Sequence, residues 1–576
     1  MNAPAFRVPV TFGPGFCKLW LLALNAVAIL AVTTQQIIEW NYLNPDGLSY
    51  LEMGAHSLES GPAKLLSLHW SPLYPALIAL FLAMFRPDPV HEVAVVHVLN
   101  GVIFAANSTA CAWFIWRWLR ANWDAFGMTE RPALRFIAFS TFVYGLFLWT
   151  SYEFIYVPRV TPDALVMLAG LAAAACCYGI GENPGGRWRY AALGMILGLG
   201  YWAKAAMLPI GVLFLLVIWI SPPGRAVRRR NLIIAGATFA VLAAPLILAL
   251  SLMAGKLTFG ESGRLNMAWW NRNIGSYMGF WEGPPDAGIP QHPPRILNRV
   301  PLVLEFNGPI RATYPLWYDP AYWNAGLKVR VWPAVLMAAS IRDFKAMWAA
   351  VTAKQVLNWG LTIMLLVRLI YWRRRWTGRN NLWLLGWGIV ALAIYLPAFF
   401  EPRYQGAAIV FLWVAAYGLL VDAKALRYQQ AVVFAVGLSL AAPVLRDAWN
   451  RPRYIRQILA GRAHPDQTLR AAAQLRSVGL RPGDAIATVG YSFDAGYARV
   501  AGLHIVAQVK EADEWWKLAP PERETIEDAI RKTGARALVA FKKPGACACP
   551  GWTLVGDSGY FIRLFDPRPA APYGSR

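Results

Sequence analysis

Apolar runs long enough to cross a bilayer recur along the first 450 residues of this chain, and they restrict its fold more than any other feature. A helix needs about 20 apolar residues to span the hydrocarbon layer. We expect eleven such helices, at about 19–38, 92–117, 134–152, 162–180, 190–203, 206–220, 231–253, 355–371, 382–399, 406–421 and 429–447. The sequence therefore predicts a polytopic α-helical membrane protein.

The composition agrees with a chain that is solvated mostly by lipid. Charged residues make up 15% of the 576 residues and hydrophobic residues 57%, whereas a soluble domain carries roughly 25% charged residues. The net charge of +23 does not indicate nucleic-acid binding, because the arginines gather in short clusters such as WRWLR, GRAVRRR and YWRRRWTGR. Clusters of this kind between apolar runs are typical of cytoplasmic loops.

The basic clusters all fall on one side of the membrane if the N-terminus is cytoplasmic and Pro72–Phe85 does not span. That piece has only 14 residues and begins with two nearby prolines, which suits an interfacial or re-entrant helix. The C-terminus is then outside, and the large outer loops lie at about 39–91 and 254–353. No small-x-small cleavage site follows the first run, so we expect a retained helix and no cleaved signal peptide.

After residue 450 the pattern changes to helical segments that alternate with short β-branched runs such as DAIATVG and LHIVAQV. We interpret 1–450 as the membrane domain and 451–576 as a small extracytoplasmic α/β domain. TVGYSFDAGY lacks the glycine spacing of a phosphate loop, so this domain is interpreted as docking or acceptor-guiding. The six cysteines show no metal-ligand spacing, and the CAC pair of Cys547 and Cys549 has no assigned role.

Ionisable residues stand at the outer ends of several predicted spans. Asp46 follows the first span, Asp163 begins the fourth, and Lys204 lies in the outer turn between the fifth and sixth. Ionisable groups near membrane depth are costly and usually functional. Structural alternatives exist, because Asp163 also complements the dipole of its helix and Lys204 can snorkel to the interface. Arg403 and Lys64, on other outer segments, are further candidates to bind a lipid phosphate.

The long outer loop is rich in aromatic, amide and acidic side chains, notably in RATYPLWYDPAYWNAG. Aromatic rings stack on the faces of pyranose sugars and polar side chains bond their hydroxyls, so the loop indicates a sugar-binding surface. The alternative is an interfacial plug that is held by its aromatic residues. The candidate sugar- or acceptor-binding residues of this loop are Tyr314, Trp317, Tyr318 and Asp319.

Together these segments resemble the GT-C superfamily of membrane glycosyltransferases, in particular the group of the protein O-mannosyltransferases and the bacterial lipid A aminoarabinose transferase. PDGLSYLEMG is similar to the outer-loop motif with the catalytic aspartate, and HWSPLYPALIALFLAMF to the juxtamembrane helix after it. VTPDALVMLAGLAAA resembles the second acidic motif, ALGMILGLGYWAKAAMLP the span that ends in a lysine, and PRYQGAAIVFLWVAAYG the Arg-Tyr start of a late span. Gly47 stands where the O-mannosyltransferases have a second acid, which leaves the acceptor class open.

The resemblance implies a GT-C fold with an extracytoplasmic active site, a polyprenyl-phosphate sugar as donor, and a location in the bacterial inner membrane. Asp46 is then the base of a single inverting displacement, and Lys204 with Arg403 stabilises the phosphate leaving group. Asp163 holds a Mg²⁺ or Mn²⁺ ion together with Asp46, or orients Lys204.

Two further residues of the matching motifs, Tyr50 and His69, are candidates for sugar or acceptor binding. The acceptor is expected to be a cell-envelope glycan, a lipid or a protein. A transporter or flippase of lipid-linked glycans is the main alternative, although no repeat joins the two halves and the acids gather at one face. A scaffold with a partner-binding outer domain would leave Asp46, Asp163 and Lys204 without a shared purpose.

Overall fold

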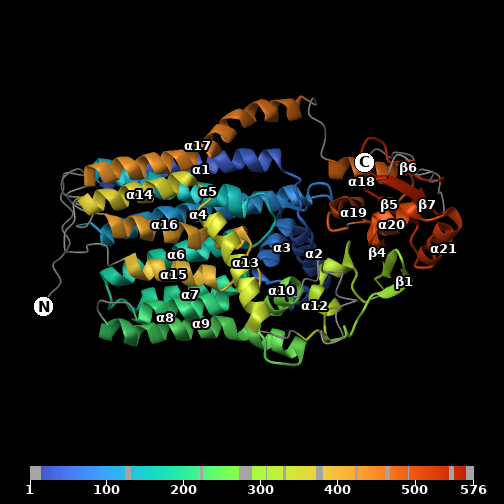
Figure 1. Cartoon of the computed structure of the whole chain (residues 1–576), viewed down its shortest axis with the longest axis horizontal. Helices are drawn as coiled ribbons and strands as arrows, with labels where there is room; N and C mark the ends of the chain where they lie inside the picture. Colours follow the sequence, from blue (N-terminus) through green and yellow to red (C-terminus); the bar gives the residue numbers. More distant parts are fainter. Residues whose placement is uncertain are drawn as a thin grey trace.

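The computed structural model describes residues 14–123, 132–220, 225–271, 288–306, 308–328, 333–370, 381–421, 426–460, 467–490, 492–543 and 550–565. It consists of a bundle of long helices with a mixed α/β domain at one end (Figure 1). The YWRRRWTGR cluster, Cys547 and Cys549 lie outside the described residues.

Each of the eleven segments that were expected to span the membrane is helical. Their bounds are α1 (Pro14–Ile38), α4 (Glu92–Ala121), α5 (Pro132–Trp149), α6 (Asp163–Glu182), α7 (Arg187–Ala203), α8 (Met207–Ile220), α9 (Arg225–Ala254), α14 (Gln355–Ile370), α15 (Leu382–Ala393), α16 (Gly406–Leu420) and α17 (Leu426–Leu459). By length and composition, seven described helices can cross a membrane, or eight if α13 (Pro333–Val351) and α14, bent by 80°, count as one span. The polytopic helical domain is thus confirmed, while the count of eleven spans is not.

The bundle has two chemically different ends. α6 begins at Asp163 and ends at Glu182, and its 20 residues extend ~30 Å, the thickness of the hydrocarbon layer. Near the end of α4, Arg117 donates to the Glu182 carboxylate at 2.5 Å, and Arg120 lies 3.6 Å from the same group. Arg117 and Arg120, at the end of the second predicted span, therefore lie at the opposite end of the bundle from Asp163.

Short elements cover the Asp163 end. They are α2 (Pro45–Ser60), η1 (Pro62–Leu65), α3 (Leu73–Phe85), η2 (Thr150–Ile155), α10 (Ser262–Asn271), α11 (Pro315–Tyr318), α12 (Pro320–Trp323) and η6 (Pro402–Gln405). α3 has 13 residues and is too short for a straight span, in line with the expectation for Pro72–Phe85. η2 is a π-helical turn that packs against η6, and such turns often occur at functional sites.

The C-terminal domain is built on one sheet. Its own elements are α18 (Gln467–Ser477), β3 (Ala485–Val489), α19 (Gly496–Ala501), β4 (His504–Val509), α20 (Ala512–Lys517), α21 (Pro520–Arg531), β5 (Ala537–Ala540), β6 (Thr553–Leu554) and β7 (Phe561–Leu564). The outer loop adds β1 (Arg295–Arg299) and β2 (Leu302–Glu305), and the described strands run in the order β1-β2-β4-β3-β5-β7-β6. β3 pairs in parallel with β4 and β5. The sheet thus begins in the outer loop, and α17 continues past residue 450 to Leu459.

Candidate active site

Asp46 stands in the first turn of α2, close behind the first long helix. Just before it, Asn44 Oδ1 accepts a hydrogen bond from the Val160 backbone N–H at 2.9 Å, which ties this turn to the segment ahead of α6. Gly47 is packed so closely that a Cβ at this position would lie 2.6 Å from the Val160 Cβ. No side chain of a second acid fits after Asp46 without a shift of this segment.

Two carboxylates and two cations alternate at this end of the bundle. Arg403 of η6 donates from Nη2 to Asp46 Oδ2 at 2.7 Å, and its Nη1 lies 3.8 Å from Asp163 Oδ2. Lys204, in the turn between α7 and α8, places Nζ 2.6 Å from Asp163 Oδ1. We call Asp46, Arg403, Asp163 and Lys204 the charged row; four segments that are distant in the sequence supply it.

Asp163 is the most buried member of the charged row, with a side chain that is 1% exposed, against 20% for Lys204. A buried charge is tolerated only when it is paired, and Lys204 is the nearer of the two cations that compensate the Asp163 carboxylate. The Lys204 ammonium also lies 3.3 Å from the centre of the Tyr404 ring, a cation–π contact. Lys204 is therefore fixed by two partners and does not extend to the surface as a snorkelling residue would. Tyr404 was not predicted as a site residue, although it follows Arg403 directly in the Arg-Tyr motif.

Two cavities meet at the Asp46–Arg403 pair. The larger has a volume of about 680 Å³ and is lined by the whole charged row together with Tyr50 and His69. The smaller has a volume of about 360 Å³ and is lined by Asp46 and Arg403, but not by Asp163 or Lys204. Its other polar walls include Arg159, Glu401 and Asn44. A reacting group at Asp46 is thus in contact with two cavities whose walls carry different side chains.

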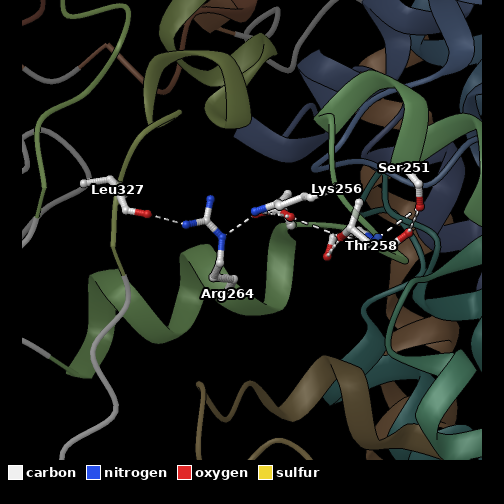
Figure 2. Close-up of polar contacts among 7 residues, drawn as sticks. Ser251, Lys256, Thr258, Arg264 and Leu327 are labelled. Carbon is white, nitrogen blue, oxygen red and sulfur yellow. Dashed lines mark hydrogen bonds and ion pairs between the residues drawn. The ribbon is translucent and has the colours of Figure 1, made fainter.

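A second group of charges lines the larger cavity, on the loop between α9 and α10 and in the first turn of α10. The Glu261 carboxylate accepts hydrogen bonds from Thr258 at 3.1 Å, from Lys256 at 3.3 Å and from Arg264. Arg264 also donates to the Leu327 carbonyl, and Figure 2 shows the contacts that run from Leu327 through Arg264 towards Lys256 and Thr258. These charges carry no motif in the sequence, and only the folded loop brings them to the cavity wall.

Of the loop candidates, Trp317 reaches the charged row. Its Nε1 donates to Asp46 Oδ1 at 3.3 Å, and its ring lines the smaller cavity. The other candidates are not among the residues that line either cavity. Tyr314 donates to Gln508 of β4, the Tyr318 hydroxyl contacts His56, Asp319 accepts from the Tyr322 N–H at the start of α12, and Lys64 is exposed on η1.

His69 lines both cavities, and its ring centre lies 4.4 Å from that of Trp70. Burial lowers the pKa of His69 to about 4, and the nearby Asp46 carboxylate only partly opposes this shift. The imidazole is therefore neutral at pH 7, and it can donate a hydrogen bond from one nitrogen and accept one at the other.

The low pKa of His69 predicts a loss of stability in mild acid. The pKa of the same group is 6.5 when exposed, so between pH 6.5 and pH 4 the unfolded chain binds more protons than the folded one. This contribution is constant above pH 6.5, and folding weakens as the pH falls, by about 2 kcal/mol at pH 5. Thermal unfolding in detergent at pH 7 and pH 5 measures this loss, which should be smaller in His69→Gln. Equal losses in both proteins would contradict it.

The charged row does not fit the divalent cation that was expected between Asp46 and Asp163. Each carboxylate faces a side-chain cation, Asp46 the Arg403 guanidinium and Asp163 the Lys204 ammonium. Within the described ranges, no three His, Cys, Asp or Glu side chains are grouped so that they could hold a metal ion. The predicted Mg²⁺ or Mn²⁺ is therefore not confirmed.

The bundle, the charged row at one end and the α/β domain above it define a multi-pass membrane protein with the GT-C fold, as the motifs had suggested. A solved structure that supports this fold is ArnT from Cupriavidus metallidurans bound to undecaprenyl phosphate. It is 13% identical and matches 97% of this chain and 100% of its own, with a TM-score of 0.50. The likeness concerns the fold.

The Archaeoglobus fulgidus oligosaccharyltransferase in complex with Zn and sulfate is also similar. It is 12% identical, covers 90% of this chain and 67% of its own, and has a TM-score of 0.48. No family model matches the sequence, and no curated protein matches it.

Proposed function

We propose that this protein is a glycosyltransferase that moves a sugar from a polyprenyl phosphate to an acceptor on the extracytoplasmic face. The observation that carries the proposal is the charged row, with Asp46 and Arg403 at the meeting of two cavities. ArnT, which shares the fold, has been solved with undecaprenyl phosphate bound. The arginines at the opposite end of the bundle support the outer location, because such residues are typical of cytoplasmic loops.

The larger cavity suits the donor. Its walls carry four cations, and the Lys204 and Arg403 side chains lie beside the reacting position at Asp46. An apolar groove of about 590 Å³ runs between α8 and α9 and shares Leu257 with this cavity. A prenyl tail lying in the groove would leave its phosphate among the cations.

The smaller cavity suits the acceptor, because its walls combine Arg159, Glu401 and Asn44 with aromatic rings. In the reaction, an acceptor hydroxyl attacks the anomeric carbon while the bond from that carbon to the phosphate oxygen breaks. Asp46 accepts the hydroxyl proton, and polyprenyl phosphate leaves with the electron pair. Lys204 and Arg403 stabilise the charge on the leaving phosphate, and the sugar is inverted.

A proteoliposome assay tests the function and separates it from transport. The purified protein is supplied with a labelled polyprenyl-phosphate sugar and with cell-envelope fractions as the source of acceptor. A transferase releases polyprenyl phosphate and moves the label into one of the fractions. Faster movement of the intact labelled lipid between leaflets, without release, would instead support a flippase.

The apolar groove gives a second prediction. Ala244 is exposed on α9 and lines the groove, so Ala244→Trp should fill it and raise the KM for a long-chain donor about tenfold. A short-chain donor should be affected little, because its tail ends before the groove. Val241→Trp, on the same helix but not among the groove-lining residues, is the matched control. Equal KM values for both variants with the long-chain donor would place the tail elsewhere.

A further inference from the structure

The C-terminal domain forms charged contacts with α2, the helix that carries Asp46, and with the start of α4. Arg499 of α19 donates two hydrogen bonds to the Glu92 carboxylate, each at 3.0 Å, and lies 3.7 Å from Glu52 of α2. Glu52 is 2% exposed and also accepts the Thr313 backbone N–H at 2.9 Å. These buried charges fix α2, the outer loop and the C-terminal domain to one another.

A second contact leads from this domain to Asp46 itself. Phe493, in the loop after β3, is 5% exposed, and its ring packs edge-to-face on Trp317 at 5.0 Å between ring centres. On its other side, Trp317 packs edge-to-face on Trp70 at 5.6 Å. The Phe493 ring thus supplies the contact from the C-terminal domain, while the indole N–H donates to Asp46 at 3.3 Å.

This contact occupies a place where α/β domains commonly bind ligands. β4 and β5 flank β3 in the sheet, and the carboxyl ends of parallel strands at such a switch point form a binding crevice. Here the outer loop lies against those ends, because Tyr314 packs on Phe493 and donates to Gln508 at 2.9 Å. Gln508 in turn donates to the Gly490 carbonyl at 2.6 Å. The outer loop around Tyr314, a segment of the same chain, thus occupies the crevice.

We propose that Phe493 is a positioning residue that holds the Trp317 indole against Asp46, so that the C-terminal domain takes part in setting the geometry of the reaction. Without the Phe493 ring, the indole loses the ring contact with the shortest centre-to-centre distance given above, and its N–H moves off the carboxylate. The inference rests on the proposed function in so far as Asp46 is the base, but the contact can be measured without turnover.

The contact is tested in the full-length protein labelled with fluorotryptophan. The ¹⁹F line of Trp317 is assigned by its loss in Trp317→Phe, and it should shift or broaden in Phe493→Ala. Phe541→Ala is the matched control, since Phe541 is exposed in the same domain and packs on Tyr560. Phe493→Leu keeps most of the apolar volume and serves if the alanine variant does not fold. A Trp317 line that is unchanged in both Phe493 variants overturns the proposal.

Turnover provides the second measurement. Phe493→Ala should lower kcat about tenfold, the size expected when a hydrogen bond to a charged group is lost, with the donor KM unchanged and Phe493→Leu in between. A shifted line with normal kcat would also overturn the proposal. If the wild-type protein shows no transfer, the proposed function fails, while the ¹⁹F line still decides whether Phe493 positions Trp317.

Discussion

Asp46→Asn should lower turnover by a factor of ~10²–10⁴, the usual contribution of a general base, while donor binding stays nearly unchanged. Asparagine keeps the shape of the side chain and can still accept the Trp317 N–H, which lies 3.3 Å from Asp46 Oδ1. It cannot take the proton of the acceptor hydroxyl. The measurement is the rate of sugar transfer in proteoliposomes, together with binding of the donor to the purified variant.

Glu59→Gln provides the control for this substitution, because Glu59 is an exposed acid on the same helix. It should transfer at the wild-type rate. Normal transfer by Asp46→Asn would remove Asp46 from the base role, whereas loss of both transfer and donor binding would show that the substitution disturbs the larger cavity.

Lys204→Met should destabilise the protein by about 3 kcal/mol, because it leaves the buried Asp163 carboxylate without its nearest partner. The estimate lies at the low end of the range for broken buried pairs, since Arg403 remains 3.8 Å away. The double variant with Asp163→Asn should recover most of this stability, because no buried charge is then left unpaired. Thermal unfolding of the three proteins in detergent measures the effect.

Donor binding separates the two roles of Lys204. Both the single and the double variant should bind polyprenyl phosphate at least tenfold more weakly, since the ammonium beside the phosphate is absent in each. Lys64→Met, at an exposed lysine on η1, should change neither stability nor binding. Full donor affinity in the stable double variant would limit Lys204 to a structural role.

The members of the charged row can be recognised in the sequence because an ionisable residue stands out within or beside an apolar run. Asp46, Asp163 and Lys204 each interrupt or end an apolar run, and loop charge alone places them at one face. Arg403 is identified by its motif. The ion pairs between them require the three-dimensional arrangement of α2, α6, α7 and η6, which no local pattern encodes.

The outer loop is harder to predict, because composition does not tell a cavity wall from a packed interface. Trp317, Tyr314 and Tyr318 lie within five residues, yet of these three only Trp317 lines either of the two cavities described above, and Tyr314 is buried against β4. Likewise, Lys256, Glu261 and Arg264 look like ordinary loop charges until the loop folds against Leu327. β1 and β2 were missed; they pair with each other, but they join the sheet through β4, which is distant from β2 in the chain.

The pairing of β2 with β4 affects the order in which parts of the protein can fold. β2 forms its ladder with β4, where Val303 faces Val509, so the segment that presents Trp317 to Asp46 cannot complete its sheet until some 200 further residues have been synthesised. Non-local strand pairing is slow to form because a long loop must close first. The helices can insert into the lipid one after another during translation, but the wall beside Asp46 is finished only when the last domain of the chain has folded. A chain that ends before Phe493 therefore carries Asp46 and Trp317 without the ring that packs on the indole from the C-terminal domain.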